Sequence, residues 1–207
     1  DDEGTFILEE LTQVLAADFV WSHRTGPFVT NLSSSRAIDD VAARHSQPVH
    51  RSAVGEVNVV QRMKAVDAVL GGEGNGGVIL PDLHYGRDAL VGTALILQHL
   101  AETGRSLSAL HADLPQYAMA KDKLPLPDRS PERLLNALAE QYADEDTSDI
   151  DGLKINFSDS WVHMRPSNTE PILRVYTEAP TDADAQALAD RFKDELRSLL
   201  DTLDETE

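Results

Sequence analysis

A polar segment between two apolar stretches carries the side chains best suited to binding an anion. It reads RPSNTEP over residues 165–171, and Arg174 follows it closely. Arginine can hold a phosphate through two parallel N–H···O bonds, and the backbone N–H groups of a turn can add further donors. We interpret this segment as a binding loop for a dianionic phosphate. The alternative is that Arg165 and Arg174 form surface ion pairs with Glu170 or Glu178.

A second candidate is the glycine-dense segment GGEGNGG at residues 71–77. Its only functional side chains are Glu73 and Asn75, because glycines surround them and would let the backbone approach a ligand closely. A carboxylate accepts two hydroxyl donors and an amide both donates and accepts, which suits the vicinal hydroxyls of a sugar. The alternative is a plain glycine turn with Glu73 exposed. The formal GxGxxG match does not indicate a dinucleotide site, because residues 78–80 predict a strand instead of a helix.

Other residue patterns do not predict a site. A calcium loop starting at Asp144 would need glycine at its sixth position, which is Asp149. No two histidines have a metal-ligand spacing, and the chain has no cysteine. We therefore predict no metal ligand set and no catalytic residue in this chain.

The balance of charge is unusual. The 207 residues hold 36 acidic and 18 basic side chains, for a net charge of -18. This charge repels nucleic acids and anionic membranes, and no apolar run approaches ~20 residues, so we expect neither partner and a cytoplasmic protein. Asp is commoner than Glu and Arg commoner than Lys. We interpret this as halophilic adaptation to strong screening, the alternative being an ordinarily acidic protein.

The elements that must position the two segments fall into two groups. Residues 1–105 predict alternating strands and helices, which is typical of an α/β layer. We expect a short strand at the start of the chain, and a long helix over 87–101 that is apolar nearly all round and therefore buried. Residues 106–207 predict strands joined by short turns, a helix over 131–142, and a last helix with a capping box at Thr181 and Asp184, as in a small α+β domain.

Three motifs in order, GGEGNGG, the GRD of residues 86–88 and RPSNTEPILRVYTEA over 165–179, resemble the α-D-phosphohexomutase family. That family includes phosphoglucomutase, phosphomannomutase and phosphoglucosamine mutase. The resemblance spans essentially the whole chain and matches the third and fourth domains of a four-domain enzyme. It implies an α/β/α layered domain with a mixed sheet over 1–105, which binds the sugar, and a small α+β domain with an antiparallel sheet over 106–207, which binds the phosphate.

The resemblance also assigns residues. The segment SAVGEVNVVQRM is similar to a substrate-facing loop of the family and adds Glu56 to the sugar contacts. The implied sugar-binding residues are Glu73, Asn75 and Glu56. The implied phosphate-binding residues are Arg165, Ser167, Asn168, Thr169 and Arg174.

The family's reaction interconverts hexose 1-phosphate and hexose 6-phosphate through a phosphoserine and a hexose 1,6-bisphosphate. The phosphoserine loop and the aspartate-rich loop for Mg2+ are not in these 207 residues. The resemblance therefore implies a chain that binds phosphosugar, needs N-terminal domains and Mg2+ for catalysis, and is inactive by itself. The alternative is a self-standing, non-catalytic phosphosugar-binding module.

Overall fold

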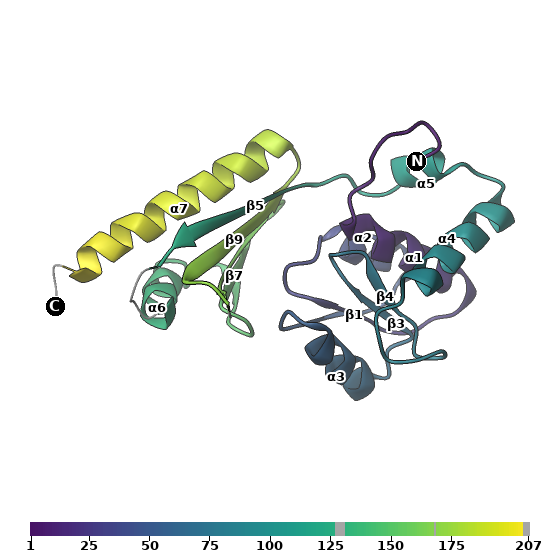
Figure 1. Ribbon diagram of the computed structural model, residues 1–207, viewed down its shortest axis with the longest axis horizontal. Helices are drawn as coiled ribbons and strands as arrows, with labels where there is room; N and C mark the ends of the chain where they lie inside the picture. Colours follow the sequence, from purple (N-terminus) through teal and green to yellow (C-terminus); the bar gives the residue numbers. More distant parts are fainter. Residues whose placement is uncertain (127–130, 168, 205–207) are drawn as a thin grey trace. The chain divides into compact units, whose positions relative to one another are not determined.

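The computed structural model describes residues 1–126, 131–167 and 169–204, in two compact units, Asp1–Gln116 and Tyr117–Glu207 (Figure 1). The division lies after α5 (Leu107–Ala112), whereas the sequence suggested a boundary before it. Helix α5 joins the first unit because the backbone N–H and the hydroxyl of Ser108 both donate to the Asp2 carboxylate.

The first unit is a three-layered α/β/α structure, which confirms the expected fold class. Its mixed sheet has the order β2-β1-β3-β4, in which only the β3–β4 pair is antiparallel. Helix α3 covers one face of the sheet, and α1, α2 and α4 lie on the other (Figure 1). The elements are α1 (Glu10–His23), β1 (Phe28–Asn31), α2 (Ala37–His45), β2 (Val49–Ser52), α3 (Glu56–Val66), β3 (Leu70–Glu73), β4 (Gly77–Ile79) and α4 (Ala89–Thr103).

Burial of apolar side chains fixes β1 and β3 between the helices. On the α3 face, Val29 lies in a cluster with Val59 and Met63. On the α1 face, the Thr30 hydroxyl donates to the Gln13 side chain at 3.0 Å. Both strands are parallel neighbours, so their last residues share one edge of the sheet, which is where ligands bind in open α/β sheets.

The expected strand at the start of the chain is absent from residues 5–8, which have no regular secondary structure. The Asp1 carboxylate accepts from the backbone N–H groups of Glu3 and Thr5, so this segment turns back on itself and does not pair with the sheet. Phe6 is consequently 77% exposed. Of the apolar residues that suggested a strand, Leu8 is also exposed and Ile7 is only partly buried.

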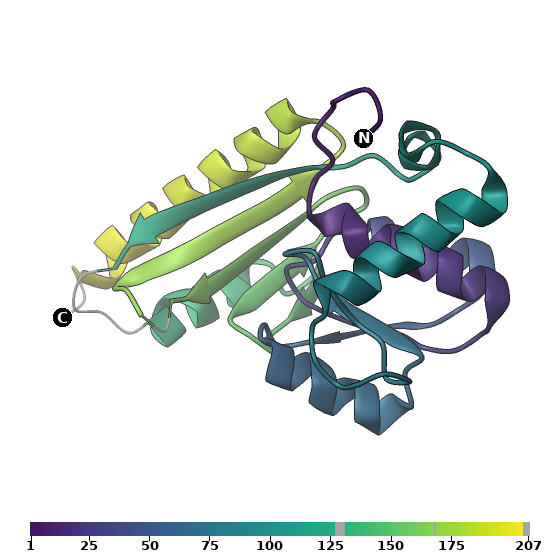
Figure 2. The ribbon, with the colours of Figure 1, turned by 45° about the vertical axis from the view of Figure 1, so that its right-hand side comes forward.

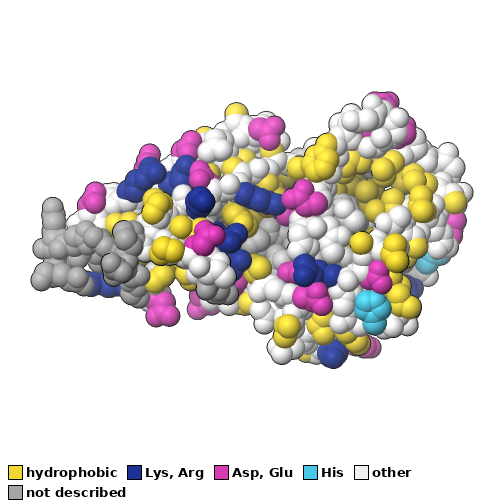
Figure 3. Space-filling model, viewed as in Figure 1, with side chains coloured by type: hydrophobic (Ala, Val, Ile, Leu, Met, Phe, Trp, Pro, Cys, Tyr) yellow, Lys and Arg dark blue, Asp and Glu magenta, His cyan; other side chains and the backbone are white. Residues whose placement is uncertain are grey.

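The expectation that the long apolar helix is buried was also wrong. Helix α4 forms over Ala89–Thr103, but only Gly92 and His99 are buried. Leu90 and Leu97 are 81% and 59% exposed, and hydrophobic side chains lie along this part of the first unit in Figure 3. One side of the helix packs against α1 and against the edge strand β4. The described residues do not cover the apolar side chains on its other side.

The second unit is an antiparallel sheet with helices on one face, as the sequence predicted (Figure 2). The strand order is β5-β9-β8-β7-β6. Short β6 lies within the acidic segment of residues 144–152. The elements are β5 (Ala118–Pro125), α6 (Pro131–Gln141), β6 (Asp146–Ser148), β7 (Leu153–Asn156), β8 (Trp161–Pro166), β9 (Ile172–Ala179) and α7 (Asp182–Asp204).

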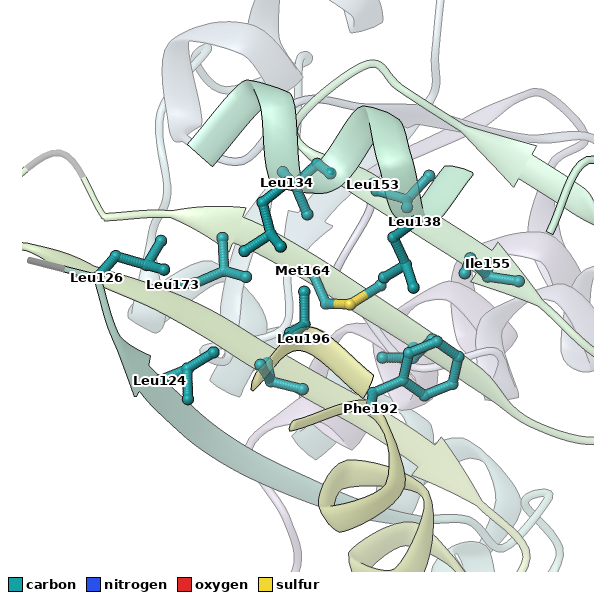
Figure 4. Close-up of a cluster of buried hydrophobic side chains, with 13 residues drawn as sticks. Leu124, Leu126, Leu134, Leu138, Leu153, Ile155, Met164, Leu173, Phe192 and Leu196 are labelled. Atoms are coloured by element: carbon teal, nitrogen blue, oxygen red, sulfur yellow. The ribbon is translucent and has the colours of Figure 1, made fainter. Parts of the chain in front are cut away.

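The core of the second unit lies between this sheet and helices α6 and α7. Figure 4 shows Leu124, Met164 and Leu173 of the strands directed toward Phe192 and Leu196 of α7. Successive strand residues face opposite sides, so the residues next to these point away from the helices. The predicted capping box forms at the start of α7, where the Asp184 N–H donates to the Thr181 hydroxyl at 3.2 Å.

Candidate functional site

Glu73, the last residue of β3, is a buried carboxylate held by three donors. Its Oε1 accepts from the Asn31 side-chain amide at 3.1 Å and from the Gly55 N–H at 3.2 Å. Its Oε2 lies 3.2 Å from Nη1 of Arg87. The residue is only 4% exposed, so the alternative of a plain glycine turn with an exposed Glu73 is wrong. An ionised carboxylate has about four acceptor sites, so three donors leave room for one more.

Glu56 lies on the same charged cluster. As the first residue of α3, it accepts from Nε of Arg87 at 2.7 Å. Arg87 thus joins the two carboxylates that the sequence placed in the sugar site. The hydrogen bond to Glu56, followed by the charge of Glu73, raises the pKa of Arg87. Arg87 belongs to the GRD motif, but nothing in the local sequence indicates that it contacts both acids.

Asn75 occupies a different environment. It is exposed in the turn between β3 and β4, and its Oδ1 accepts from the Gly77 N–H at 3.2 Å. The structure therefore brings Glu56 and Glu73 together through Arg87. Asn75 instead caps the neighbouring turn.

The glycine-dense segment is mainly a β-hairpin, where the sequence suggested a loop. Its glycines permit close approach to side chains of this chain. A Cβ on Gly74 would lie 2.0 Å from a carboxylate oxygen of Glu10, and one on Gly77 would lie 2.4 Å from Cδ of Arg87. Glu10 is itself buried and accepts from the Ser35 N–H at 3.3 Å. The glycines therefore allow the acidic cluster and its neighbours to pack.

The second candidate site is the end of the β8–β9 hairpin. Arg165 and Arg174 are directly opposite each other in the antiparallel register, so both lie on the face turned away from the helices. Nη1 of Arg165 is 3.9 Å from Asp151, and Nη1 of Arg174 donates to the Tyr176 hydroxyl at 3.0 Å. That hydroxyl raises the pKa of Arg174. Within the described residues, the buried Nε of Arg165 has no hydrogen-bond acceptor.

The loop that joins the two strands has a compact hydrogen-bonded form. The Ser167 N–H donates to the carbonyl of Ile172 at 2.9 Å. The Ser167 and Thr169 hydroxyls are 3.4 Å apart, and the Thr169 N–H is 3.4 Å from Oγ of Ser167. Asn168 lies outside the described residues. The structure thus places four of the five predicted phosphate-binding residues at one end of one hairpin.

An open pocket of about 400 Å3 borders the same loop. Among the described residues its lining is mainly apolar, with Ser167 and Glu170 as the polar members. The described residues also bring together no group of three His, Asp or Glu side chains that could hold a metal ion.

Comparison with known proteins identifies both units. Residues 9–117 match the model of the phosphoglucomutase/phosphomannomutase α/β/α domain III, and residues 122–195 match that of the family's C-terminal domain. A phosphoglucomutase/phosphomannomutase of Thermococcus kodakarensis is 36% identical over 90% of this chain and 41% of its own length. A Methanopyrus kandleri protein named "Probable phosphoglucosamine mutase" is 34% identical over 99% of this chain and 46% of its own length. The chain thus spans less than half the length of these relatives.

Solved structures show the same fold. A phosphoglucomutase/phosphomannomutase family protein of Burkholderia thailandensis superposes with a TM-score of 0.80 and 26% identity, over 95% of this chain and 43% of its own. The N-acetylphosphoglucosamine mutase of Aspergillus fumigatus, solved with GlcNAc-6P and magnesium, superposes with a TM-score of 0.65 and 15% identity, over 96% and 46% of the two chains. The chain therefore belongs to the phosphoglucomutase/phosphomannomutase family, of which it holds the α/β/α domain III followed by the C-terminal domain.

Proposed function

We propose that this chain is the substrate-binding half of a phosphohexomutase, an enzyme that interconverts hexose 1-phosphate and hexose 6-phosphate through a phosphoserine and a hexose 1,6-bisphosphate. The observation that carries the proposal is the Arg165–Arg174 pair beside the hydroxyl-rich loop, in a chain whose family consists of phosphohexose mutases. One relative of known structure was solved with glucose 1,6-bisphosphate, a ligand of the kind that the reaction would form.

In this proposal the β8–β9 loop holds the phosphate that is not being transferred. Arg165 and Arg174 supply charge and paired donors, and Ser167, Asn168 and Thr169 supply hydroxyl, amide and backbone donors. The buried Nε of Arg165, which has no acceptor among the described residues, supports this role, because a buried donor without an acceptor costs free energy that an anion would recover.

The sugar is proposed to bind at the carboxyl edge of the first unit's sheet. Glu73 has one acceptor site left after its three internal donors, and Glu56 is the more exposed carboxylate of the same cluster. Asn75 is proposed as a further contact from the adjacent turn. A carboxylate held rigidly by Arg87 and Asn31 would read hydroxyl positions at low entropic cost.

Transfer itself would depend on groups outside this chain. Phosphoryl transfer relies on positioning and electrostatic stabilisation, and this chain's residues would supply the positioning of sugar and distal phosphate. Mg2+ would support the phosphoryl transfer in the intact enzyme. The described residues gather no ligand set for it, so no step assigned to them involves the metal. We accordingly propose that the 207-residue chain binds substrate and does not turn it over alone.

The second candidate is a self-standing phosphosugar-binding module. The two candidates predict the same ligand and differ in what precedes the chain in its gene. A serine loop and an aspartate-rich metal loop encoded upstream would select the mutase.

Calorimetric titration of the chain with glucose 1-phosphate and glucosamine 1-phosphate tests the binding role. Changing Arg165 or Arg174 to Gln should weaken binding at least about tenfold, because each removes a charge-assisted contact. Arg197→Gln is the matched control, since Arg197 lies on α7 and forms an ion pair with Asp194 in which both side chains are exposed. Equal affinities for all these proteins would contradict the proposed site.

A further inference from the structure

We propose that Lys123 is a third cation of the phosphate site and acts with Arg165 and Arg174 on the dianion of a phosphate monoester. This inference rests on the function proposed above and extends it to a residue that no sequence motif singled out. It derives from the pairing of three neighbouring strands.

Strand β9 places Arg174 between two other cations. Arg174 pairs with Arg165 of β8 on one side and with Lys123 of β5 on the other. Adjacent strands are ~4.8 Å apart, so the three Cα atoms form a row about 10 Å long across the sheet. Lysine and arginine side chains are long enough for their charged ends to converge over such a row.

The three side chains share the face that the helices leave uncovered. Their strand neighbours Leu124, Leu173 and Met164 lie in the core against α7 (Figure 4). Asp122, also next to Lys123, forms an ion pair with Lys193 of α7. Because side chains alternate along a strand, Lys123 must point to the opposite side, and it is exposed there.

The charge of this row is poorly compensated within the described residues. Like charges directly opposite each other destabilise a sheet, and here three occur in succession. Arg174 donates to a neutral hydroxyl, with the charge of Glu170 as a lesser influence, and Arg165 is 3.9 Å from its carboxylate neighbour. The Lys123 ammonium has no ion-pair partner in the described ranges. Acidic side chains outnumber basic ones twofold in this chain, 36 to 18, so uncompensated cations are a local exception.

The row suits a phosphate monoester for chemical reasons. The planar guanidinium groups of Arg165 and Arg174 can each bind two phosphate oxygens and fix its orientation. Lysine is a compact charge on a flexible stem, so Lys123 can follow the phosphate when the sugar attached to it changes orientation. Lys123 would thus raise the affinity of the site for the phosphate dianion, whether the phosphate is attached at one end of the hexose or at the other.

The test compares Lys123→Gln with Lys121→Gln in the full 207-residue chain. Lys121 lies on the same strand and face, opposite Tyr176, so its change removes the same charge one pair farther from the loop. Glucose 1-phosphate is titrated at fixed salt, and unchanged amide spectra confirm that each variant is folded. We expect Lys123→Gln to weaken binding about tenfold, Lys121→Gln less than about twofold, and Lys123→Arg to retain most of the affinity.

The outcomes separate this inference from the proposed function. If the unaltered chain fails to bind glucose 1-phosphate at millimolar concentration, the proposed function fails and the inference fails with it. If the unaltered chain binds and Lys123→Gln binds equally well, only the inference is overturned. Equal losses in both glutamine variants would show a general effect of net charge and would also overturn it.

Discussion

Arg87 lies between Glu56 and Glu73: its Nε donates to Glu56 at 2.7 Å, and its Nη1 forms an ion pair with Glu73 at 3.2 Å. These contacts join the end of β3, the start of α3 and the segment that leads into α4. Glu73 is buried, so its charge depends on compensation from these donors. Arg87 therefore makes the carboxylate edge of the first unit a single rigid cluster.

Arg87→Met should destabilise the first unit by about 1–2 kcal/mol, because Glu73 would lose its only cationic contact among the described residues while it stays buried. The estimate is kept low because Arg87 is 39% exposed and water screens the pair. The chain has one tryptophan in each unit, Trp21 and Trp161, so their indole N–H signals follow the two units separately in a urea series. The signal of Trp21 should shift to lower urea, and that of Trp161 should not.

Arg105→Met is the control for this prediction. Arg105 forms an ion pair with Asp113 in the same unit, but both side chains are well exposed. Its loss should change stability less than the loss of Arg87. Equal effects would mean that Arg87 is only a surface charge.

Gly152→Ala should destabilise the second unit by about 3 kcal/mol or more, since the change adds a clash to an unfavourable backbone conformation. Gly152 has a φ of +73°, and its added Cβ would lie 2.2 Å from the carbonyl oxygen of Met164. Gly104→Ala separates the two causes. Gly104 has a φ of +65° with nothing within 4 Å of the added Cβ, so only the conformational cost of about 1–2 kcal/mol remains. The Trp161 signal reports the unfolding of the Gly152 variant, and the Trp21 signal reports that of the Gly104 variant. Similar losses of stability in the two variants would contradict the predicted clash.

The second unit should lose stability as the pH falls from about 6.5 to about 4. Burial lowers the pKa of His163 to about 4, while the unfolded chain has the ordinary value near 6.5. Between these values the unfolded state binds the proton and the folded state does not, so the stabilisation present above pH 6.5 disappears on acidification. The loss is on the order of 3 kcal/mol. His163→Gln, which keeps a donor for the Asp151 carbonyl, should remove this part of the pH dependence of the Trp161 transition. An identical pH profile in the variant would contradict the assignment.

Raising KCl from roughly 0.1 to 2 M should raise the melting temperature of the chain. We propose that the charge of -18 reflects a surface adapted to high salt, where the Debye length is ~3 Å and self-repulsion costs little. Differential scanning calorimetry measures the shift. A melting temperature that stays constant or falls over this range would favour the alternative of an ordinarily acidic protein.

Local pattern was sufficient to predict the hairpin that carries Arg165 and Arg174. Alternating apolar residues define both strands, and the polar loop between them fixes which residues are opposite. Local pattern did not predict a role for Lys123, because its strand is far in sequence from the loop at residues 165–171. Only the register of β5 with β9 places Lys123 beside Arg174.

The sugar cluster depended on long-range contacts that local pattern does not encode. Glycine spacing drew attention to Glu73, but not to its burial or to its contacts with Asn31 and Arg87. Helix α4 illustrates the same limit. Its apolar composition correctly predicted a helix. The exposure of its side chains depends on which neighbouring elements cover them, and within the described residues no element covers one side of the helix.

We propose that the β8–β9 loop binds the phosphate and that the Glu73 edge binds the sugar. Amide chemical shifts, mapped during titration with glucose 1-phosphate and separately with inorganic phosphate and with glucose, test both assignments. We predict that both phosphate-containing ligands shift Ser167 and Thr169, and that glucose 1-phosphate alone also shifts residues around Glu73. Amide shifts of Ser167 and Thr169 that do not change at millimolar glucose 1-phosphate would contradict the proposed phosphate site.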